Sequence, residues 1–234
     1  MPSTKSPNST SGESPKISVV IATYNYGKFI SRAVDSVLAQ TMKNYEIIVV
    51  DDGSTDNTQK ILAGYGDRIR IIKQENQGYV KAKNRGLREA RGEYVILLDA
   101  DDEFLPQILE KLSEALEKDT AAVFAYCDYH EMESTGKKKL ISLKENLFNS
   151  VGIGILFRKS VLEEAGLYDV GLIFPEYDLL LKIQQKGYGG VDVNTPLFVY
   201  YRHKGSITTD KEKVEKGRKQ LEERYGKKIH IREY

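Results

Sequence analysis

The sequence predicts an α/β fold in which a mostly parallel central sheet is flanked by helices. Three short runs, at residues 17–22, 46–51 and 94–99, are rich in Val, Ile or Leu and show no alternation of apolar and polar residues. Uniform runs of this kind are typical of strands that are covered on both faces. Helical patterns separate the runs, and alternating strands and helices favour a parallel sheet in the first half of the chain.

Four helices are expected in this first half, two of them because apolar residues recur at helical spacing and two because of signals at their ends. Pro106 suits the first turn of one helix, polar residues near Ser54 suit the start of another, and Arg91 with Gly92 suits the end of a third. The four predicted helices cover residues 29–38, 55–65, 78–90 and 108–116.

The second half is less regular. It is expected to contain strands at 121–130, 152–158 and 196–201, helices at 159–165 and 175–186, and a turn with an exposed basic run at 134–139. The polar segment 211–234 is expected to be a surface helix or partly disordered.

Composition narrows the class of protein. The chain has 234 residues, which suits one α/β domain with at most a small appendage. Its 35 Lys and Arg residues against 34 Asp and Glu residues give a net charge of +1, which argues against a nucleic-acid binder. The single cysteine, Cys127, lies in an apolar run and is expected to be buried. Residues 1–15 resemble a disordered leader, and no membrane span or export signal is recognised, so a cytoplasmic protein is expected.

Polar and acidic residues follow the three predicted strands, as ATYN at 22–25, DDGS at 51–54 and DADD at 99–102. Ligands bind at the carboxyl ends of the strands in open α/β sheets. Turn and cap roles remain the alternative for residues 51–54, since Asp, Gly and Ser favour turns. The carboxylates at 99–102 repel one another, so their clustering favours a bound cation, and Mg²⁺ or Mn²⁺ matches oxygen ligands combined with substrate phosphates.

Two common phosphate-binding motifs are missing from the sequence. The residues after the first predicted strand, TYNYG at 23–27, contain no G-x-G-x-x-G, and no P-loop with Gly-Lys-Ser/Thr is present. Phosphates must therefore be neutralised mainly by a metal and by side chains.

Five motifs in order resemble the family 2 glycosyltransferases, which have the GT-A fold. The resemblance covers roughly residues 16–206, and each motif alone is a weak signal. Together they are specific for the fold and reaction class but say little about the sugar or the acceptor. The motifs are SVVIATYN at 18–25, VVDDGSTD at 49–56, NQG at 76–78 with AKN at 82–84 and Gly86, LDADD at 98–102, and the region 174–182.

The resemblance implies a nucleoside pocket lined by Ala22, Tyr24 and Asp52. In this interpretation Asp52 hydrogen-bonds a uracil-like base edge and Asp51 supports its turn. Lys83 stands where the family usually has Arg. Both side chains are cationic, but Lys lacks the bidentate fork of Arg.

The resemblance also implies a metal site. Asp101 would ligate the divalent cation on the diphosphate, and Asp99 would bind the ribose or contribute to the metal shell. Asp102 would either support these ligands or form a turn.

Inverting transfer requires a carboxylate that takes the acceptor proton. The family usually supplies an Asp from a Glu-Asp pair at a helix start, and here the corresponding pair is Pro175-Glu176. Asp178, two residues on, is the other catalytic candidate, but two residues are about 200° apart around a helix. Glu176 shares the more apolar face, with Leu179, Leu180 and Ile183, so Glu176 is expected to point toward the cleft. The alternative is that both acids only favour the positive end of the helix.

Residues 200–206, YYRHKGS, resemble a family loop that closes over the diphosphate, with its usual Arg displaced by one position. Arg202 and His203 are candidate phosphate contacts, although a lone His is more often structural. The basic runs at 137–139 and in the tail favour solvated faces. Peripheral membrane contact by the tail is an alternative if the acceptor is lipid-linked.

The predicted organisation is a leader at 1–15, a GT-A domain at 16–206 and a polar tail at 207–234, with a nucleotide-sugar half at 16–102 and an acceptor half at 103–206. The resemblance implies inverting transfer from a UDP-sugar, with Mg²⁺ or Mn²⁺, to a carbohydrate or lipid-linked acceptor in cell-envelope polysaccharide synthesis. A catalytically weak nucleotide-sugar-binding protein is the alternative, motivated by Glu176 and Lys83. A nucleotidyltransferase is more distant, because the chain lacks a Gly-rich loop with Lys or Arg after the first strand.

Overall fold

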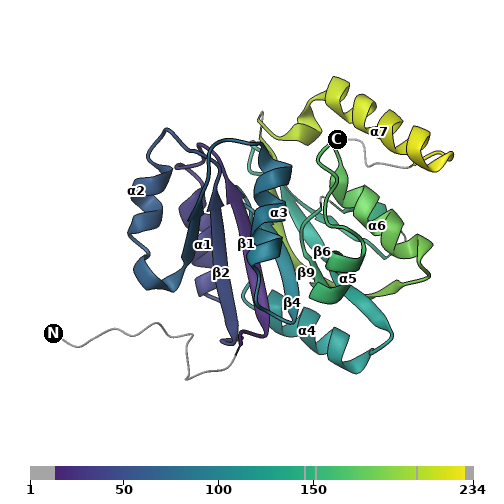
Figure 1. Cartoon of the computed structure of the whole chain (residues 1–234), viewed down its shortest axis with the longest axis horizontal. Coiled ribbons are helices and arrows are strands. Elements are labelled where there is room, and N and C mark those ends of the chain that lie inside the picture. The colour runs from purple at the N-terminus through teal and green to yellow at the C-terminus, as the bar shows by residue number, and fades with distance from the viewer. Residues whose placement is uncertain (1–13, 145, 151, 204, 230–234) are drawn as a thin grey trace.

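A nine-stranded sheet with helices on both faces forms the centre of the protein (Figure 1). The computed structural model describes residues 14–144, 146–150, 152–203 and 205–229, so all but the last two residues of the expected leader lie outside the described residues. The strand order is β3-β2-β1-β4-β8-β6-β9-β5, and β7 pairs with β6.

The first half of the sheet is parallel, as the uniform apolar runs predict. Its strands are β1 (Ile17–Thr23), β2 (Tyr45–Asp51), β3 (Arg70–Lys73) and β4 (Tyr94–Asp99). Ala22 of β1 is in register with Val50 on one side and with Asp99 on the other. The carboxyl ends of β1, β2 and β4 therefore lie level with one another, and the polar residues that follow them meet at one edge.

The second half of the sheet is mixed. The strand β8 (Ile155–Arg158) runs antiparallel between β4 and β6 (Ala122–Met132), and β9 (Gly189–Tyr201) runs parallel to β6. The short β5 (Glu103–Phe104) pairs antiparallel with β9, and β7 (Lys138–Ile141) forms a hairpin with β6. Parallel pairing thus prevails in the first half of the sheet but not in the second.

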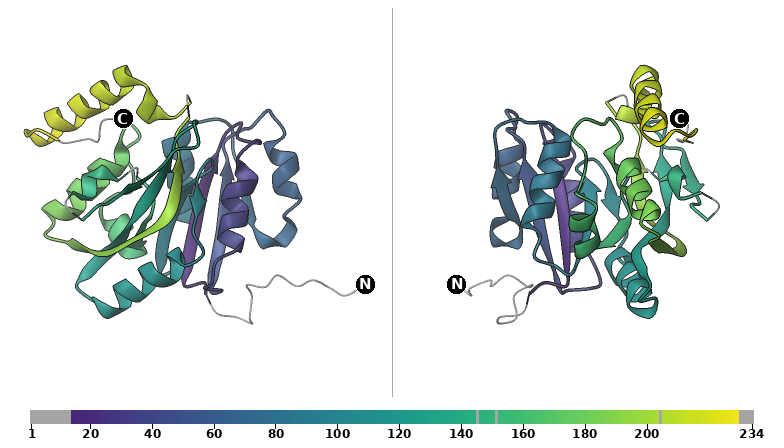
Figure 2. Two further views of the ribbon diagram at one scale, coloured as in Figure 1. Left: turned by 180° about the vertical axis from the view of Figure 1, so that it is seen from behind. Right: turned by 45° about the vertical axis from the view of Figure 1, so that its right-hand side comes forward.

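The helices form two layers (Figure 2). One layer, with buried residues in a core cluster that includes Val19 and Ile21, contains α1 (Ile30–Leu38), α2 (Thr58–Ala63) and α4 (Ile108–Lys118). The other layer packs around Val20 and contains α3 (Tyr79–Glu89), α5 (Lys159–Glu164) and α6 (Pro175–Gln185). Because successive residues of β1 point to opposite faces, one strand serves both cores.

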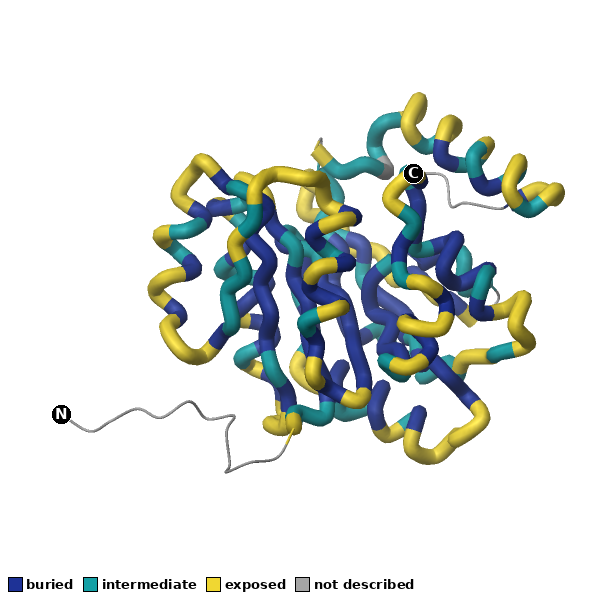
Figure 3. Tube along the Cα trace, viewed as in Figure 1, coloured by how far each residue is buried: buried dark blue, intermediate teal, exposed yellow. Residues whose placement is uncertain are grey.

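The strands form the most deeply buried part of the fold (Figure 3). Gly86 allows α3 to lie close to the sheet, since a Cβ atom there would come within 2.3 Å of Val20 Cγ1. Cys127 on β6 is fully buried as expected, and its thiol donates to the carbonyl of Gly154 at 3.5 Å. Burial raises the pKa of the Cys127 thiol.

Several elements differ from the sequence expectation. The strands β3, β5 and β7 were not predicted, and β9 begins at Gly189 rather than near Pro196. Gly190 is a poor strand former, but here the ring of Phe124 occupies the space that a side chain would fill, 2.0 Å from the position of a Cβ atom. Tertiary packing therefore overrides local propensity in this strand.

The polar tail forms a helix, α7 (Lys211–Tyr225), that lies against the region of α6 (Figure 1). Leu221 on α7 is fully buried, and Gly226 in the left-handed conformation, with φ 62°, ends the helix. Short 3₁₀ turns occupy Gly66–Arg68, Leu147–Asn149 and Ile207–Thr209.

Candidate active site

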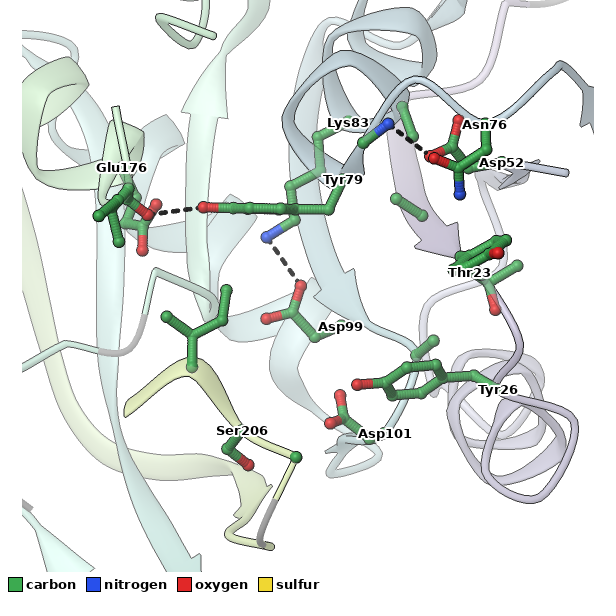
Figure 4. A pocket seen from close by; sticks show the side chains of 18 of the residues that line it. Thr23, Tyr26, Asp52, Asn76, Tyr79, Lys83, Asp99, Asp101, Glu176 and Ser206 are labelled. Atoms are coloured by element: carbon green, nitrogen blue, oxygen red, sulfur yellow. Dashed lines mark hydrogen bonds and ion pairs between the residues drawn. The ribbon is translucent and has the colours of Figure 1, made fainter. Parts of the chain in front are cut away.

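A pocket of about 450 Å³ opens at the edge where the carboxyl ends of β1, β2 and β4 meet. Its wall is completed by α3, by residues 173–176 before and at the start of α6, and by residues 205–207 (Figure 4). All but three of the sequence-predicted site residues line it. Those that line it are Ala22, Tyr24, Asp52, Lys83, Asp99, Asp101 and Glu176. Asp178, Arg202 and His203 are not part of its lining.

The ends of β1 and β2 are held together by Asn25. Its backbone has a φ of 57°, and its side-chain oxygen accepts hydrogen bonds from the amides of Thr55 at 2.7 Å and Asp56 at 3.2 Å. The Ser54 amide in turn donates to Asp51 at 3.0 Å, which is the turn-supporting contact expected of Asp51. These bonds fix the polar rim of the pocket before any ligand binds.

Asp52 joins the end of β2 to the loop that leads into α3. Its carboxylate accepts hydrogen bonds from the Gln74 side chain at 2.7 Å and from the amides of Gln77 at 2.9 Å and Gly78 at 2.8 Å. Only 1% of Asp52 is exposed. Tyr24, in contrast, is 43% exposed and also lines the pocket. Asp52 therefore combines a pocket position with a structural role.

An ion pair lies across the middle of the pocket. The Lys83 ammonium is 2.8 Å from Asp99 and 5.4 Å from the ring centre of Tyr79 (Figure 4). Burial opposes the charge of Lys83, but the carboxylates of Asp99 and Glu176 outweigh it and raise the pKa of Lys83. Lys83 therefore remains charged and balances two acids.

Asp101 is bound to His203, 102 residues away in the chain. The Nε2 atom of His203 lies 2.7 Å from the Asp101 carboxylate, and the Gly205 amide donates to Nδ1 at 3.1 Å. Because Nδ1 accepts, we assign the ring proton to Nε2, which donates to Asp101. The ring also stacks on Phe29 at 5.4 Å between centroids. Burial raises the pKa of Asp101, and Asp99 raises it further.

Asp102 is turned away from the pocket. It is fully buried, and its carboxylate accepts a hydrogen bond from the Tyr201 amide at 2.8 Å. Burial, followed by repulsion from Asp101 and Asp99, raises the pKa of Asp102 well above its usual range. Among the residues that the structure describes, no group of three or more His, Cys, Asp or Glu side chains is arranged to hold a metal on its own.

Glu176 lies in the first turn of α6, after Pro175, and faces the pocket from the side opposite Asp52 (Figure 4). Burial raises the pKa of Glu176 to about 7; Lys83 partly offsets this effect, and Asp99 adds to it. Gly152, with φ 80°, covers the side chain so closely that a Cβ atom there would come within 2.7 Å of Glu176 Cγ. The carboxylate is thus held in a confined, poorly solvated position.

Asp178 faces the opposite way, as the helical spacing predicts. It is fully buried and lies 2.9 Å from Arg224 and 2.7 Å from Lys182, and the Tyr225 hydroxyl donates to it at 2.7 Å. Arg202 follows β9, where its amide donates to the Met132 carbonyl at 2.9 Å. Neither residue shares the pocket with Glu176.

Tyr79 is the most informative residue that sequence reasoning missed. It begins α3, lines the pocket, and donates a hydrogen bond to the Ile173 carbonyl at 2.6 Å (Figure 4). This bond joins α3 to the segment before α6. Helical spacing is the available signal, since Tyr79 stands four residues before Lys83 and so shares its face.

Comparison with known proteins identifies what the chain is similar to. The sequence model of "Glycosyl transferase family 2" matches residues 18–166. An uncharacterized glycosyltransferase of Rickettsia typhi is 37% identical over 186 residues, with 72% of this chain and 58% of that protein covered. Glycosyltransferase GlyG of Streptococcus pneumoniae is 40% identical over 124 residues, with 51% of this chain and 41% of that protein covered. The chain therefore spans only part of the relatives that it matches.

Solved structures share its fold. TarS 1–349 of S. aureus in complex with UDP has a TM-score of 0.68 at 20% identity, covering 88% of this chain and 65% of that one. The mannosyltransferase PcManGT from Pyrobaculum calidifontis, in complex with GDP-Man and Mn²⁺, has a TM-score of 0.72 at 19% identity, covering 97% and 67%. These matches confirm the fold class that the sequence predicts. Within the described residues, no helix is long and apolar enough to cross a membrane.

Proposed function

Because this chain belongs to glycosyl transferase family 2, with the GT-A fold, we propose that it transfers a sugar from a UDP-sugar to an acceptor hydroxyl with inversion at the anomeric carbon. The observation that carries the proposal is one pocket with three parts: the polar ends of β1 and β2, the acids Asp99 and Asp101, and a confined Glu176. The acceptor would be a carbohydrate or a lipid-linked sugar.

The nucleoside would bind beside Ala22, Tyr24 and Asp52. The exposed ring of Tyr24 offers a face for stacking, and Asp52 is an acceptor held rigidly by three hydrogen bonds. UDP is the donor nucleotide in the TarS complex, whereas PcManGT was solved with GDP-Man. Support for UDP therefore comes from one of these two neighbours together with the resemblance of the motifs.

The residues present fit a divalent cation shared with the donor. Mg²⁺ and Mn²⁺ commonly bind one or two carboxylates together with substrate phosphates. Asp99 and Asp101 line the same pocket, and Asp99 helps to raise the pKa of Asp101, as expected where two acids lie close together. Asp101 and Asp99 would hold the ion, whose charge would stabilise the departing diphosphate.

Glu176 would act as the general base. The acceptor oxygen forms a bond to the anomeric carbon while the bond from that carbon to the diphosphate oxygen breaks. The diphosphate leaves with the bonding electrons, and the Glu176 carboxylate takes the acceptor proton. Attack opposite the leaving group inverts the configuration. Lys83, held by Asp99, adds positive charge on the donor side of the pocket.

Donor turnover tests this function. Incubation with UDP-GlcNAc, UDP-glucose and GDP-mannose in Mn²⁺, with water and simple glycosides as acceptors, is expected to release UDP. Binding of UDP without turnover would instead support the nucleotide-sugar-binding alternative, which the Glu in the base position favours. Release of GDP alone would contradict the UDP assignment.

The pH dependence of turnover follows from Glu176. Only the deprotonated carboxylate accepts a proton, and the pKa of Glu176 is raised to about 7. Activity is therefore expected to rise by up to about tenfold per pH unit below this pKa and to level off above it. Initial rates of UDP release across the neutral range, at saturating Mn²⁺ and donor, measure this profile. Glu176→Gln should abolish the rise, and a rise that persists would assign the titration to another group.

Replacing Asp52 with Ala is expected to weaken UDP affinity about 10- to 100-fold, because it removes a charged hydrogen-bond acceptor that also fixes the loop before α3. The Mn²⁺ effect on affinity should remain, since Asp52 lies away from Asp101 (Figure 4). Calorimetric titration with UDP, with and without Mn²⁺, measures both. The exposed Asp67 provides the matched control as Asp67→Ala, and equal affinity in the Asp52 variant and this control would remove Asp52 from the nucleoside site.

A further inference from the structure

The C-terminal helix α7 packs directly behind the pocket wall that carries Glu176. Its buried residue Leu221 joins an apolar cluster with Phe174, Tyr177 and Leu181. Gly217 brings the α7 backbone against Phe174, since a Cβ atom at Gly217 would come within 2.4 Å of the ring. Phe174 and Ile173 line the pocket, so one layer of side chains separates α7 from the candidate site.

Gln220 of α7 holds the backbone of this wall. Its side-chain oxygen accepts a hydrogen bond from the Ile173 amide at 3.1 Å, and its side-chain nitrogen donates to the Gly171 carbonyl at 3.1 Å. The Ile173 carbonyl accepts the bond from Tyr79 on α3. The backbone of Ile173 is therefore held from behind by α7 and from the front by α3, three residues before Glu176.

A second connection reaches α6 itself. Arg224 of α7 lies 2.9 Å from Asp178 and 2.8 Å from Asp169, so it bridges the first turn of α6 to the segment before Gly171. The neighbouring Tyr225 hydroxyl also donates to Asp178. Asp178 is fully buried, and its carboxylate is compensated by these partners and by Lys182. The two connections restrain Glu176 from both sides along the chain.

We propose that α7 is a support for catalysis and that Gln220 and Arg224 are positioning residues for Glu176. The inference rests on the proposed role of Glu176 as the base. Neither residue lines the pocket, and both act through the 171–178 segment. A general base must lie within hydrogen-bond reach of the acceptor proton, so a small displacement of this segment lowers turnover without altering the donor site.

Three variants test the support. Gln220→Ala removes both hydrogen bonds, and Gln220→Glu keeps the acceptor for the Ile173 amide. Lys219→Ala is the matched control, because Lys219 is exposed and its ammonium pairs with Glu215 on α7 itself. We expect kcat for UDP release to fall about 10- to 100-fold in Gln220→Ala, with partial recovery in Gln220→Glu. UDP affinity and the KM for the UDP-sugar should match those of Lys219→Ala.

Hydrogen exchange supplies a readout that does not depend on activity. The Ile173 amide should exchange faster in Gln220→Ala than in wild type or Lys219→Ala, while amides of β1 and β4 stay protected. Unchanged exchange at Ile173, unchanged kcat in an active enzyme, or a parallel loss of UDP affinity would overturn the proposal. If the wild type releases no UDP from any UDP-sugar, the proposed function fails, and the exchange comparison still decides whether α7 holds this segment.

Arg224 gives an independent arm of the test. Arg224→Lys keeps a cation near Asp178, and Arg224→Ala removes it. The expected order of kcat is wild type, then Arg224→Lys, then Arg224→Ala, at constant UDP affinity. Equal kcat in all three proteins would overturn the assignment of Arg224 as a positioning residue and would leave Gln220 as the residue of α7 that positions Glu176.

Discussion

Glu176→Gln is expected to lower the rate of sugar transfer about 10²–10⁴-fold, the usual contribution of a positioned proton acceptor. The substitution keeps the size of the side chain but removes its ability to take the acceptor proton. Because Glu176 lies across the pocket from Asp52, the affinity for UDP-sugar should stay close to that of wild type (Figure 4). Steady-state rates and calorimetric affinities on the same preparations separate the two quantities.

Two further variants make this result specific. Asp178→Asn should cost far less turnover than Glu176→Gln, since Asp178 is engaged with Arg224 and Lys182 outside the pocket. Glu176→Asp restores the residue type that is commoner in the family but withdraws the carboxylate, so transfer at the wild-type rate would identify Glu176 as a tolerated variant of the usual base. Loss of activity in Asp178→Asn with retention in Glu176→Gln would show that the base was assigned to the wrong carboxylate.

Asp101→Ala is expected to abolish the part of donor affinity that depends on Mn²⁺. Residues that merely support a metal ligand commonly contribute about 10- to 100-fold to metal affinity, so a direct ligand should contribute at least as much. The physical basis is that Asp101 presents a partly buried carboxylate in the same pocket as Asp99. The measurement is the ratio of UDP dissociation constants with and without Mn²⁺, which should approach one in the variant.

Asp101 is hydrogen-bonded to His203, so the experiment needs a check of folding and a control variant. Asp101→Ala frees His203, which remains stacked on Phe29, so folding should be checked by thermal denaturation. The exposed Asp67→Ala variant should keep the full Mn²⁺ effect. A Mn²⁺ effect of wild-type size in Asp101→Ala would exclude Asp101 as a ligand of the ion.

The part of the site that was predictable depends on local rules. Asp52, Asp99 and Asp101 follow buried strands, and parallel strands bring their carboxyl ends to one edge. The separation of Glu176 from Asp178 follows from the angle between residues on a helix and from the apolar face that Glu176 shares with Leu179. The first argument needs only the rule for parallel strands, and the second needs only positions a few residues apart.

The remainder depends on contacts between distant parts of the chain. No local pattern brings His203 to Asp101 or the Tyr79 hydroxyl to Ile173, because the residues of each pair lie 102 and 94 positions apart in the chain. The tail is a second example. Its many charged residues predict a solvent-exposed segment, but Leu221 and Gly217 pack against the rest of the fold. Likewise Gly190, near the start of β9, leaves the space that the ring of Phe124 on the neighbouring strand occupies.

The position of Cys127 has a consequence for how the protein responds to its chemical surroundings. It is the only cysteine in the chain, so no disulfide can form within one molecule. Burial in β6 keeps its thiol protonated, and oxidants and alkylating reagents act on the thiolate. In the folded chain this thiol is therefore shielded from such reagents, and it becomes reactive only when the sheet opens.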